Sequence, residues 1–215
     1  MFPEPDWYRM RSVVLVSLLA ALISQLAPKM ALAGPDSSRI CASAIHAAEL
    51  SQRLPRFLLH AVSLAESGRW DKKAQARIAW PWTVTAGGKG KFFPTKAKAL
   101  AEVKRLRADG IRNIDVGCMQ VNLKYHGHIF GSVEEAFDPV NNVAYAAAWL
   151  KSLRDKKGSW AHAVGRYHNG HWKKRGQGYW RRVYSIWTNE QKQDFHARKK
   201  ARIAANRRRN TLARR

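Results

Sequence analysis

Apolar residues recur at helical spacing along most of the chain between residues 41 and 187. The run 57–65 is apolar on most sides, so it predicts a buried helix that delivers Glu66-Ser67-Gly68 at its end, with Gly68 as the terminator. Pro55 suits the first turn of that helix. The same spacing predicts further helices over 41–53, 95–110, 138–158, 159–167 and 179–187.

Polar residues that cap helices stand at three of the expected starts. Thr95 and Ser159 precede two of the helices, and Asp138 precedes Pro139, which suits the first helical position. Gly110 and Gly158 close two of the helices.

The segment 80–93 breaks the helical pattern. Its β-branched and aromatic residues flank Gly87-Gly88-Lys89-Gly90, which predicts a short hairpin or β-rich loop. Residues 113–117 are expected to form a short extended piece. The fold class expected is therefore α+β, predominantly α-helical, with a small β-hairpin region and no internal repeat.

The N-terminal residues have the order of a secretory signal peptide. Two arginines precede an apolar stretch over 13–26, and small residues end at Ala33, after which cleavage is expected. The apolar stretch is shorter than the about 20 residues that a membrane-spanning helix needs. An uncleaved anchor is the alternative interpretation. Translation from Met10 instead of Met1 would remove the two acidic residues that are unusual in such a segment.

These patterns divide the chain into a signal peptide (1–33), a short linker (34–40), one domain (41–191) and a basic tail (192–215). The tail holds ten basic residues and one acidic residue, a net charge of +9, with few larger apolar residues. We therefore expect a helical extension or a disordered arm there, and no second domain.

The whole chain carries 39 Lys and Arg against 15 Asp and Glu, a formal charge of +24, while 46% hydrophobic residues are enough for a core. In a cytosolic protein such a charge would indicate nucleic-acid binding. Because export is expected, cell-wall carboxylates and anionic lipids become the relevant polyanions, and no nucleic acid is expected. The tail is then expected to be either a solvated extension or an electrostatic tether to the wall or to an anionic membrane.

One carboxyl group is the first candidate for chemistry. Glu66 ends an apolar helix, and partial desolvation favours the protonated form of a carboxyl group, so Glu66 is a candidate proton donor. By itself it is also compatible with a surface residue at a helix end.

Three other clusters supply groups that suit a sugar. Gln120 and Asn122 offer amides, Tyr167-His168 offers a hydroxyl and an imidazole, and Trp80 and Trp82 offer flat apolar faces. The alternatives are that the tryptophans and Met119 pack in the core and that His168 is an ordinary surface residue.

Taken together and in order, Ala65-Glu66-Ser67-Gly68, Gly117-Cys118-Met119-Gln120 and Tyr167-His168-x-Gly170 are far more specific. This set resembles the lytic transglycosylase domain of the soluble type, family 1, which shares its fold with goose-type lysozyme. The resemblance covers 41–187. Three segments look closest to the VirB1-like branch, whose members accompany secretion, conjugation or flagellar machines: Trp-Pro-Trp-Thr at 80–83, Asp-Val-Gly-Cys-Met-Gln-Val-Asn at 115–122 and Tyr-His-x-Gly at 167–170.

The resemblance implies a monomeric, periplasmic enzyme whose partner is the peptidoglycan glycan strand, with no metal or organic cofactor. Glu66 would protonate the bond between N-acetylmuramic acid and N-acetylglucosamine and would then take a proton from the C6 hydroxyl, which yields a 1,6-anhydromuramic end. Tyr167 would hold Glu66 or the substrate's acetamido group. The expected substrate-binding residues are Ser67, Met119, Gln120, Asn122, Tyr167 and His168.

Two residues depart from the family pattern, which has Leu at position 118 and Asn at position 168. Cys118 fits a disulfide with Cys41, which export would permit. His168 puts the substrate contact of the Asn in doubt, although a neutral His can replace one hydrogen bond.

Three alternatives stay open. A lysozyme-like hydrolase needs a well-placed second carboxylate, for which Asp71 and Asp115 are the candidates, neither in a compelling sequence context. A cell-wall binder without activity would not need Glu66. A basic nucleic-acid-binding protein is what the charge alone would suggest.

Overall fold

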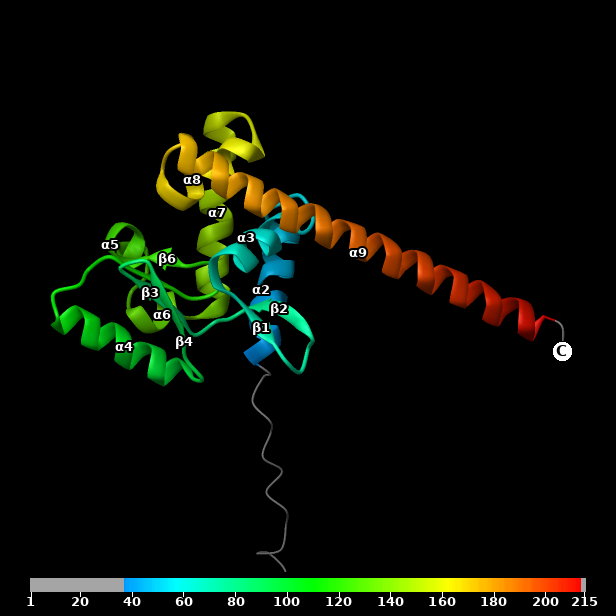
Figure 1. Ribbon diagram of the computed structural model, residues 1–215, viewed down its shortest axis with the longest axis horizontal. Coiled ribbons are helices and arrows are strands. Elements are labelled where there is room, and N and C mark those ends of the chain that lie inside the picture. Colours follow the sequence, from blue (N-terminus) through cyan, green and yellow to red (C-terminus); the bar gives the residue numbers. More distant parts are fainter. Residues whose placement is uncertain (1–36, 214–215) are drawn as a thin grey trace, which may run out of the picture. The chain divides into compact units, whose positions relative to one another are not determined.

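Helices account for most of the described chain, residues 37–213 of the computed structural model (Figure 1). The expected signal peptide (1–33) and its cleavage site lie outside the described residues. The helices are α2 (Ser37–Ser51), α3 (Leu58–Ser67), α4 (Lys96–Ala108), α5 (Leu123–His126), the 3-10 turn η1 (Gly127–Ile129), α6 (Val133–Ala136), α7 (Pro139–Lys157), α8 (Trp160–Asn169) and α9 (Lys174–Leu212). The strands are β1 (Gly68–Asp71), β2 (Ala76–Ala79), β3 (Thr83–Ala86), β4 (Lys89–Phe92), β5 (Ile114–Val116) and β6 (Val121–Asn122).

The capping signals in the sequence are confirmed. The side chains of Thr95, Asp138 and Ser159 each accept hydrogen bonds from backbone N–H groups in the first turn of α4, α7 and α8. Gly158 adopts a left-handed conformation, φ 75°, at the end of α7. These boundaries depend on residues that are neighbours in sequence, which is why they were predictable.

Several boundaries differ from expectation. Helix α3 begins at Leu58, so Pro55 lies before this helix and not in its first turn. Helix α2 begins at Ser37 and not at Cys41, so part of the segment expected to be a linker is helical. The chain after Ser67 does not turn away in a left-handed cap: Gly68 is extended, with φ −67° and ψ 124°, and it opens the β1–β2 hairpin, which was not predicted. Charged residues crowd this hairpin and obscure the alternation that marks a strand.

The hairpin expected over 80–93 is confirmed as β3 and β4, paired from Thr83 opposite Phe92 to Ala86 opposite Lys89. It belongs to a four-stranded antiparallel sheet with the strand order β4-β3-β5-β6. Asp115, the middle residue of β5, pairs with Thr85 on one side and with Asn122 on the other. The extended piece expected over 113–117 is therefore a strand inside this sheet.

The helices pack around α7, which contacts α2 and α8, while α9 contacts α3 and α8. Figure 1 shows the four-stranded sheet and α4 together on one side of α2, α3 and α7. The largest fully buried side chains are Phe137, Ile45, Leu58, Leu59, Ile114, Met119 and Leu150. Met119, expected to line a substrate floor, is thus part of the core.

Helix α3, which carries Glu66, has no cap from the residue before it. Instead the carboxylate of Glu49, a buried residue of α2, accepts hydrogen bonds from the backbone N–H groups of Phe57 (3.0 Å) and His60 (3.1 Å). A negative charge at a helix N-terminus is favourable because it faces unpaired N–H groups and the positive end of the helix dipole. Glu49 therefore anchors the start of the helix whose end carries the candidate proton donor.

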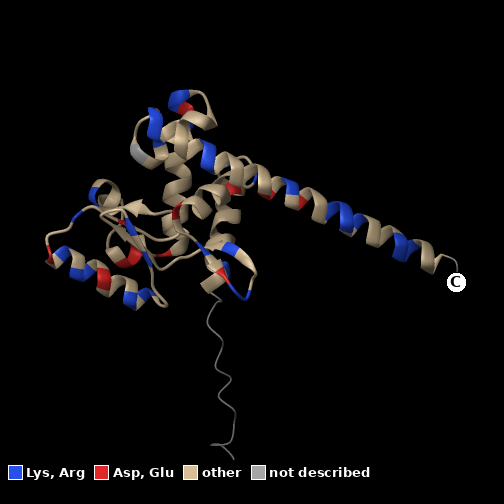
Figure 2. Cartoon of the chain, in the orientation of Figure 1, with Lys and Arg blue, Asp and Glu red and all other residues tan. Residues whose placement is uncertain are grey.

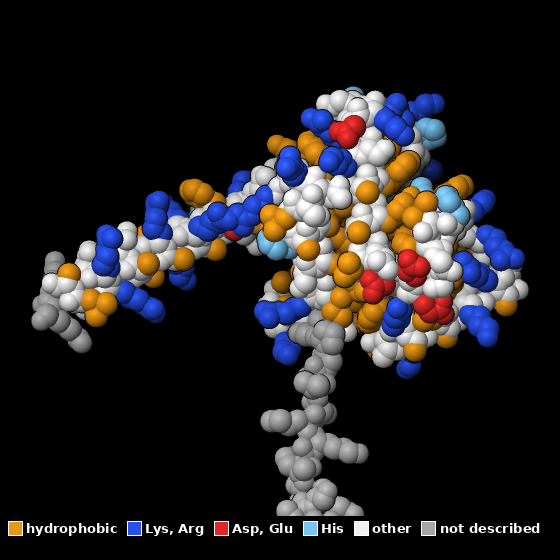
Figure 3. All heavy atoms as spheres, turned by 180° about the vertical axis from the view of Figure 1, so that it is seen from behind, with side chains coloured by type: hydrophobic (Ala, Val, Ile, Leu, Met, Phe, Trp, Pro, Cys, Tyr) orange, Lys and Arg blue, Asp and Glu red, His pale blue; other side chains and the backbone are white. Residues whose placement is uncertain are grey.

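Helix α9 joins the helix expected over 179–187 and the tail into one element of 39 residues. Of the two forms expected for the tail, the helical extension is the one present. We call residues 192–215 the basic arm; from Phe195 onward each of its described residues is exposed. Lys and Arg side chains are spread along its described residues (Figures 2 and 3). None of the described helices, α9 included, is both long and apolar enough to cross a bilayer.

Candidate active site

Glu66 lies in the last turn of α3, with its side chain only 14% exposed. Its Oε1 accepts a hydrogen bond of 2.6 Å from the hydroxyl of Tyr179 on α9. The Nδ1 atom of His168, at the end of α8, lies 3.8 Å from the same oxygen. Three helices therefore converge on this carboxyl group.

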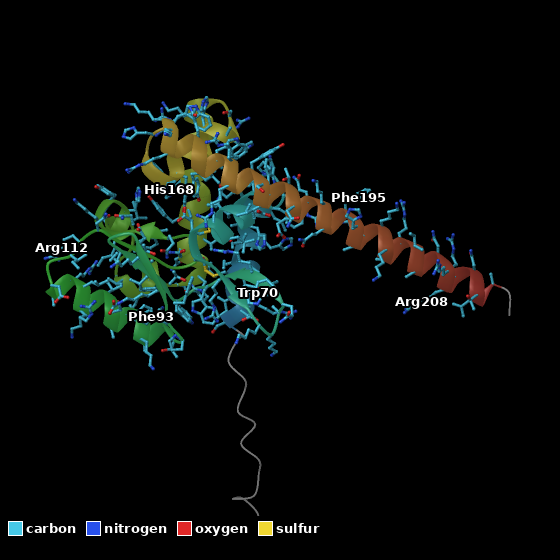
Figure 4. All side chains as sticks on the ribbon, in the orientation of Figure 1. Trp70, Phe93, Arg112, His168, Phe195 and Arg208 are labelled. Atoms are coloured by element: carbon cyan, nitrogen blue, oxygen red, sulfur yellow. A yellow bond between two sulfur atoms is a disulfide. The ribbon has the colours of Figure 1, made fainter. Side chains whose placement is uncertain are left out.

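Close packing of α8 against α9 brings Tyr179 to this position. A Cβ atom added to Gly176 would lie 2.9 Å from the backbone oxygen of Gly165 and 2.2 Å from that of His171, so no larger residue fits there. Tyr179 is 6% exposed and stacks on His168, with ring centroids 4.5 Å apart and planes 4° apart. His168, labelled in Figure 4, is 48% exposed and is therefore the solvent-facing ring of the pair.

The segment 117–120 forms a tight turn between β5 and β6. Gly117 has φ 83° and Gln120 has φ 49°, both in the left-handed region. A Cβ atom on Gly117 would lie 2.5 Å from Nδ2 of Asn142. Glycine is thus required at position 117 by both its conformation and the space around it.

Asn142, fully buried in α7, holds this turn. Its Oδ1 accepts a hydrogen bond from the N–H of Met119 (2.9 Å), and its Nδ2 donates to the carbonyl oxygens of Val116 (3.0 Å) and Ala136 (2.9 Å). All three bonds satisfy backbone groups that would otherwise be buried without a partner.

Two further hydrogen bonds attach α3 and α8 to the same turn. The hydroxyl of Ser67 donates to the carbonyl oxygen of Cys118 (2.6 Å), and the hydroxyl of Tyr167 donates to that of Met119 (2.9 Å). The disulfide expected between Cys41 and Cys118 is present, with Cα atoms 5.7 Å apart, and it ties α2 to this point. The three sequence motifs therefore meet at one place.

The structure places several expected substrate-binding residues inside the protein. Ser67 and Met119 are fully buried. Gln120 donates to the carbonyl oxygens of Gly117 (3.0 Å) and Thr83 (3.3 Å), and it accepts a bond from the Thr85 hydroxyl (2.5 Å). A substrate contact for these residues stays a prediction; what they do in the structure is shape the turn.

Tyr167 was expected to hold Glu66 or the acetamido group, but its hydroxyl is bonded to Met119 and Tyr179 holds Glu66 instead. Tyr179 was missed because its helical spacing marks it only as a core residue. Asn122, expected to contact the sugar, donates to Asp115 Oδ1 (2.7 Å) and Asn113 Oδ1 (2.6 Å) while its own Oδ1 caps α5.

Of the two carboxylates considered as partners of Glu66, only Asp115 belongs to this site. Asp71 accepts the N–H of Ala74 (2.7 Å) in the β1–β2 turn. Burial raises the pKa of Asp115 to about 6, with the charge on Glu66 adding to the rise and Asn122 and His168 opposing it. Asp115 therefore interacts electrostatically with both Glu66 and His168.

The other titratable groups of the site respond to Glu66. Its carboxylate, beside the imidazole, raises the pKa of His168. Burial, with the charge on Glu66 next in importance, raises the pKa values of Tyr167 and Tyr179 well above their usual range. Both hydroxyls therefore remain protonated donors throughout the physiological pH range.

Trp80 is joined to the candidate site through its backbone, since its N–H donates to the carbonyl oxygen of Ser67 (3.1 Å). Trp80 is buried, with its Nε1 donating to the Phe93 carbonyl oxygen (2.6 Å) and Arg69 stacked over its ring. Trp82 is partly buried and lines a hollow of about 550 Å³ with residues of α2 and the start of α7. Core packing is therefore the role that the structure gives Trp80.

Within residues 37–213 there is no group of three or more His, Cys, Asp or Glu side chains arranged to hold a metal ion. The carboxyl group of Glu66, with hydroxyl and imidazole neighbours, can transfer a proton.

Comparison with known proteins agrees with this geometry. Residues 43–185 match the model of the transglycosylase SLT domain, a range that contains Glu66, the turn 117–120 and Tyr179. Searches of curated proteins and of solved structures returned no match. The family match covers more than half of the chain, and the chain therefore belongs to the transglycosylase SLT domain family.

Proposed function

We propose that this protein is a lytic transglycosylase that cleaves the β-1,4 bond between N-acetylmuramic acid and N-acetylglucosamine and leaves 1,6-anhydromuramic ends. Enzymes of its family act on peptidoglycan, outside the cytoplasm. The observation that carries the proposal is the position of Glu66, a shielded carboxyl group at the meeting point of the three motifs and in contact with a hydroxyl donor.

In the first step Glu66 acts as the general acid. Its proton passes to the glycosidic oxygen, the bond from that oxygen to the anomeric carbon breaks, and N-acetylglucosamine leaves as an alcohol. The substrate's own acetamido group stabilises the positive anomeric carbon. Glu66 is then an anion whose Oε1 is within hydrogen-bond distance of the Tyr179 hydroxyl.

In the second step the same carboxylate acts as the base. It takes the proton of the C6 hydroxyl while that oxygen bonds to the anomeric carbon, so the proton given in the first step is recovered and no water is consumed. One carboxyl group that both gives and takes a proton needs a donor that keeps it oriented in both states. The buried Tyr179 hydroxyl, which stays protonated, meets this need.

The neighbours of Glu66 receive supporting roles in this proposal. His168 would meet the sugar, which its exposure and its stacking on Tyr179 support. Ser67 and Tyr167 hold the ends of α3 and α8 on the turn at 117–120, and Gln120 keeps that turn in its left-handed conformation. These four residues and Met119 and Asn122 then fix the shape against which the sugar is bound.

Digestion of purified sacculi tests the reaction type. Mature protein is incubated with sacculi, and the soluble fragments are analysed by mass spectrometry. Anhydromuropeptides are the expected products. Fragments heavier by one water, with reducing ends, would show hydrolysis and would replace this proposal with a lysozyme-like activity.

Replacement of the carboxyl group tests the residue. Glu66→Gln keeps the size and the hydrogen bond from Tyr179 but has no acidic proton, and general acid catalysis is worth about 10² to 10⁴ in rate. We expect a loss at least that large with an unchanged melting temperature. Glu134→Gln, the same substitution at an exposed position of α6, is the control and should digest sacculi at the parent rate. Parent-like digestion by Glu66→Gln would refute the assignment.

We further propose that the protein is exported to the periplasm by a cleavable signal peptide and opens the wall locally for a secretion, conjugation or flagellar machine. The support is the order of charges and apolar residues in 1–33 and the likeness of the 80–83 and 167–170 motifs to the VirB1-like branch. N-terminal sequencing of the periplasmic protein should begin at Gly34. Crosslinking in the native cell should recover components of such a machine.

A further inference from the structure

Trp82 is a large aromatic residue that the two proposed steps do not use. Unlike Trp80 it is only partly buried, and it lines a hollow of about 550 Å³. Ligand sites in proteins have volumes of about 300 to 1,000 Å³ and combine apolar walls with a few polar groups. This hollow has that composition, since its walls also include the apolar side chains of Ile40 and Val140 and the polar side chains of Arg39, Ser43 and Asp138.

Two walls of the hollow belong to helices that are attached to the candidate active site. Helix α2 carries Arg39 and, two residues later, Cys41, whose disulfide ends in the turn at 117–120. Helix α7 carries Val140 and, two residues later, Asn142, which holds the same turn by a hydrogen bond. The positions of both helices relative to the turn are therefore fixed.

The third wall is attached to the helix that carries Glu66. Trp82 follows Trp80 by two residues, and the N–H of Trp80 donates to the carbonyl oxygen of Ser67 at the end of α3 (3.1 Å). The oxygen of Trp82 itself accepts a hydrogen bond from the N–H of Phe93 (2.8 Å). The hollow is thus preformed, as ligand sites usually are.

The side chains of the hollow match a sugar that carries a carboxylate. The ring of Trp82 offers a flat apolar face to a pyranose. The hydroxyl of Ser43 and the carboxylate of Asp138, whose Oδ1 also caps α7, can bond sugar hydroxyl groups. Arg39 is exposed, and within residues 37–213 no carboxylate forms an ion pair with it. A guanidinium group is suited to bind a carboxylate by two parallel hydrogen bonds.

The backbone around the hollow favours the same ligand. Arg39 lies in the first turn of α2, and this turn contains no acidic residue. The N-terminus of a helix has a partial positive charge, which attracts anions. The helix end and the guanidinium group therefore act in the same direction.

We propose that this hollow is a second glycan-binding site that takes an N-acetylmuramic acid unit with its peptide stem, so that the sugar ring stacks on Trp82 and a carboxylate of the stem meets Arg39. This inference rests on the proposed function, because peptidoglycan supplies the ligand. Since the hollow is fixed relative to the turn beside Glu66, a strand bound there keeps the enzyme on the wall between two cleavages.

Nuclear magnetic resonance of the Glu66→Gln protein, which is expected not to cleave its ligand, tests this site. The probe is a soluble muropeptide, the disaccharide with its peptide stem. The signal is the indole N–H of Trp82, identified by its loss in Trp82→Phe, and it should shift during the titration. Val140→Glu, at a position that is 65% exposed, puts a negative charge into the hollow and should raise the Kd read from this signal about tenfold, as should Arg39→Gln.

Two controls separate the charge of the hollow from charge in general. Arg112→Gln removes an exposed charge from the segment between α4 and β5 (Figure 4) and should leave the Kd unchanged. A neutral oligosaccharide of N-acetylglucosamine has sugar rings but no carboxylate. It should shift the Trp82 signal with a Kd that Arg39→Gln does not change.

Each other outcome decides the question. A Trp82 signal that does not shift at millimolar muropeptide overturns the proposal, and so does an unchanged Kd in Val140→Glu. If Trp82→Phe does not fold, the backbone N–H signals of Ile40 and Val140 are read in the same way. Digestion of sacculi to anhydromuropeptides with an unresponsive hollow leaves the proposed function intact, whereas saturable binding in the hollow without digestion by the parent overturns the proposed function alone.

Discussion

Asn142 is the residue on which we expect the turn at 117–120 to depend most. Replacing it with alanine removes three hydrogen bonds at once and leaves the N–H of Met119 and the carbonyl oxygens of Val116 and Ala136 without their partner. The side chain is fully buried, so water does not replace these bonds without rearrangement. The change also opens a small cavity beside Gly117, whose backbone lies against the Asn142 amide.

The magnitude follows from these bonds. A buried polar group that loses its partner costs about 1 to 3 kcal/mol, and three such groups with partial relaxation give a loss of about 3 to 5 kcal/mol in the free energy of unfolding. Domains of this size are stable by about 5 to 15 kcal/mol, so the variant should fold but be markedly weakened. With a urea m-value of about 2 kcal/mol/M, the unfolding midpoint should fall by about 2 M.

Urea unfolding followed by tryptophan fluorescence measures this loss. The last tryptophan of the sequence is Trp187, so the signal reports on the domain and not on the basic arm. Asn141→Ala is the matched control, because Asn141 is the preceding residue of the same helix but is exposed, and its replacement should change the stability by less than about 0.5 kcal/mol. If the free energy of unfolding of Asn142→Ala is within about 1 kcal/mol of that of the parent, the three hydrogen bonds of Asn142 do not hold the turn.

Two further predictions concern the disulfide and the basic arm. Thiol titration of denatured, unreduced protein should find no free thiol. Cys41→Ser should lower the free energy of unfolding by about 4 kcal/mol, because the disulfide closes a separation of 77 residues. If the Cys41→Ser, Cys118→Ser double variant is much less stable than either single variant, the two cysteines do not act through one shared bond. Removal of residues 192–215 should weaken pelleting with sacculi at low salt, with the difference vanishing as the Debye length falls from about 10 Å at 0.1 M to about 3 Å at 1 M, while activity on short soluble glycans stays the same. Equal pelleting of the two proteins at low salt would reject a tether to the wall and leave an anionic membrane or a protein partner as its target.

Local signals in the sequence were sufficient for much of the fold. Asp138-Pro139 and Thr95 place helix starts because a cap acts within a single turn, and the glycines at 87–90 place a hairpin for the same reason. The β1–β2 hairpin was missed because its strands have only four residues each and only Gly68 and Ala79 in them are buried, which is too little for an alternating pattern to be detected.

The sequence predicted Glu66 as the candidate proton donor, but it did not predict which side chains contact Glu66. Glu66 was recognisable because three motifs follow one another in the order of the family pattern, and the disulfide was predictable because the chain has only two cysteines and export was expected. Tyr179 lies 113 residues from Glu66 on a helix whose spacing marks it only as core, so its contact exists only after folding. The amide of Gln120 suggested a contact with a sugar. The groups that this amide contacts depend on the backbone conformation of Gln120, φ 49°, which the residue type does not specify.

The continuity of α9 has a mechanical consequence. The helix that presents Tyr179 to the carboxyl group is the same helix that ends in the basic arm, without a break between Lys174 and Leu212. At 1.5 Å per residue, Leu212 lies about 50 Å along the axis from Tyr179. A continuous helix keeps a fixed length, so a surface that binds the far end of the arm would set the distance between that surface and the active site. Each whole turn added to the arm would increase this distance by about 5.4 Å.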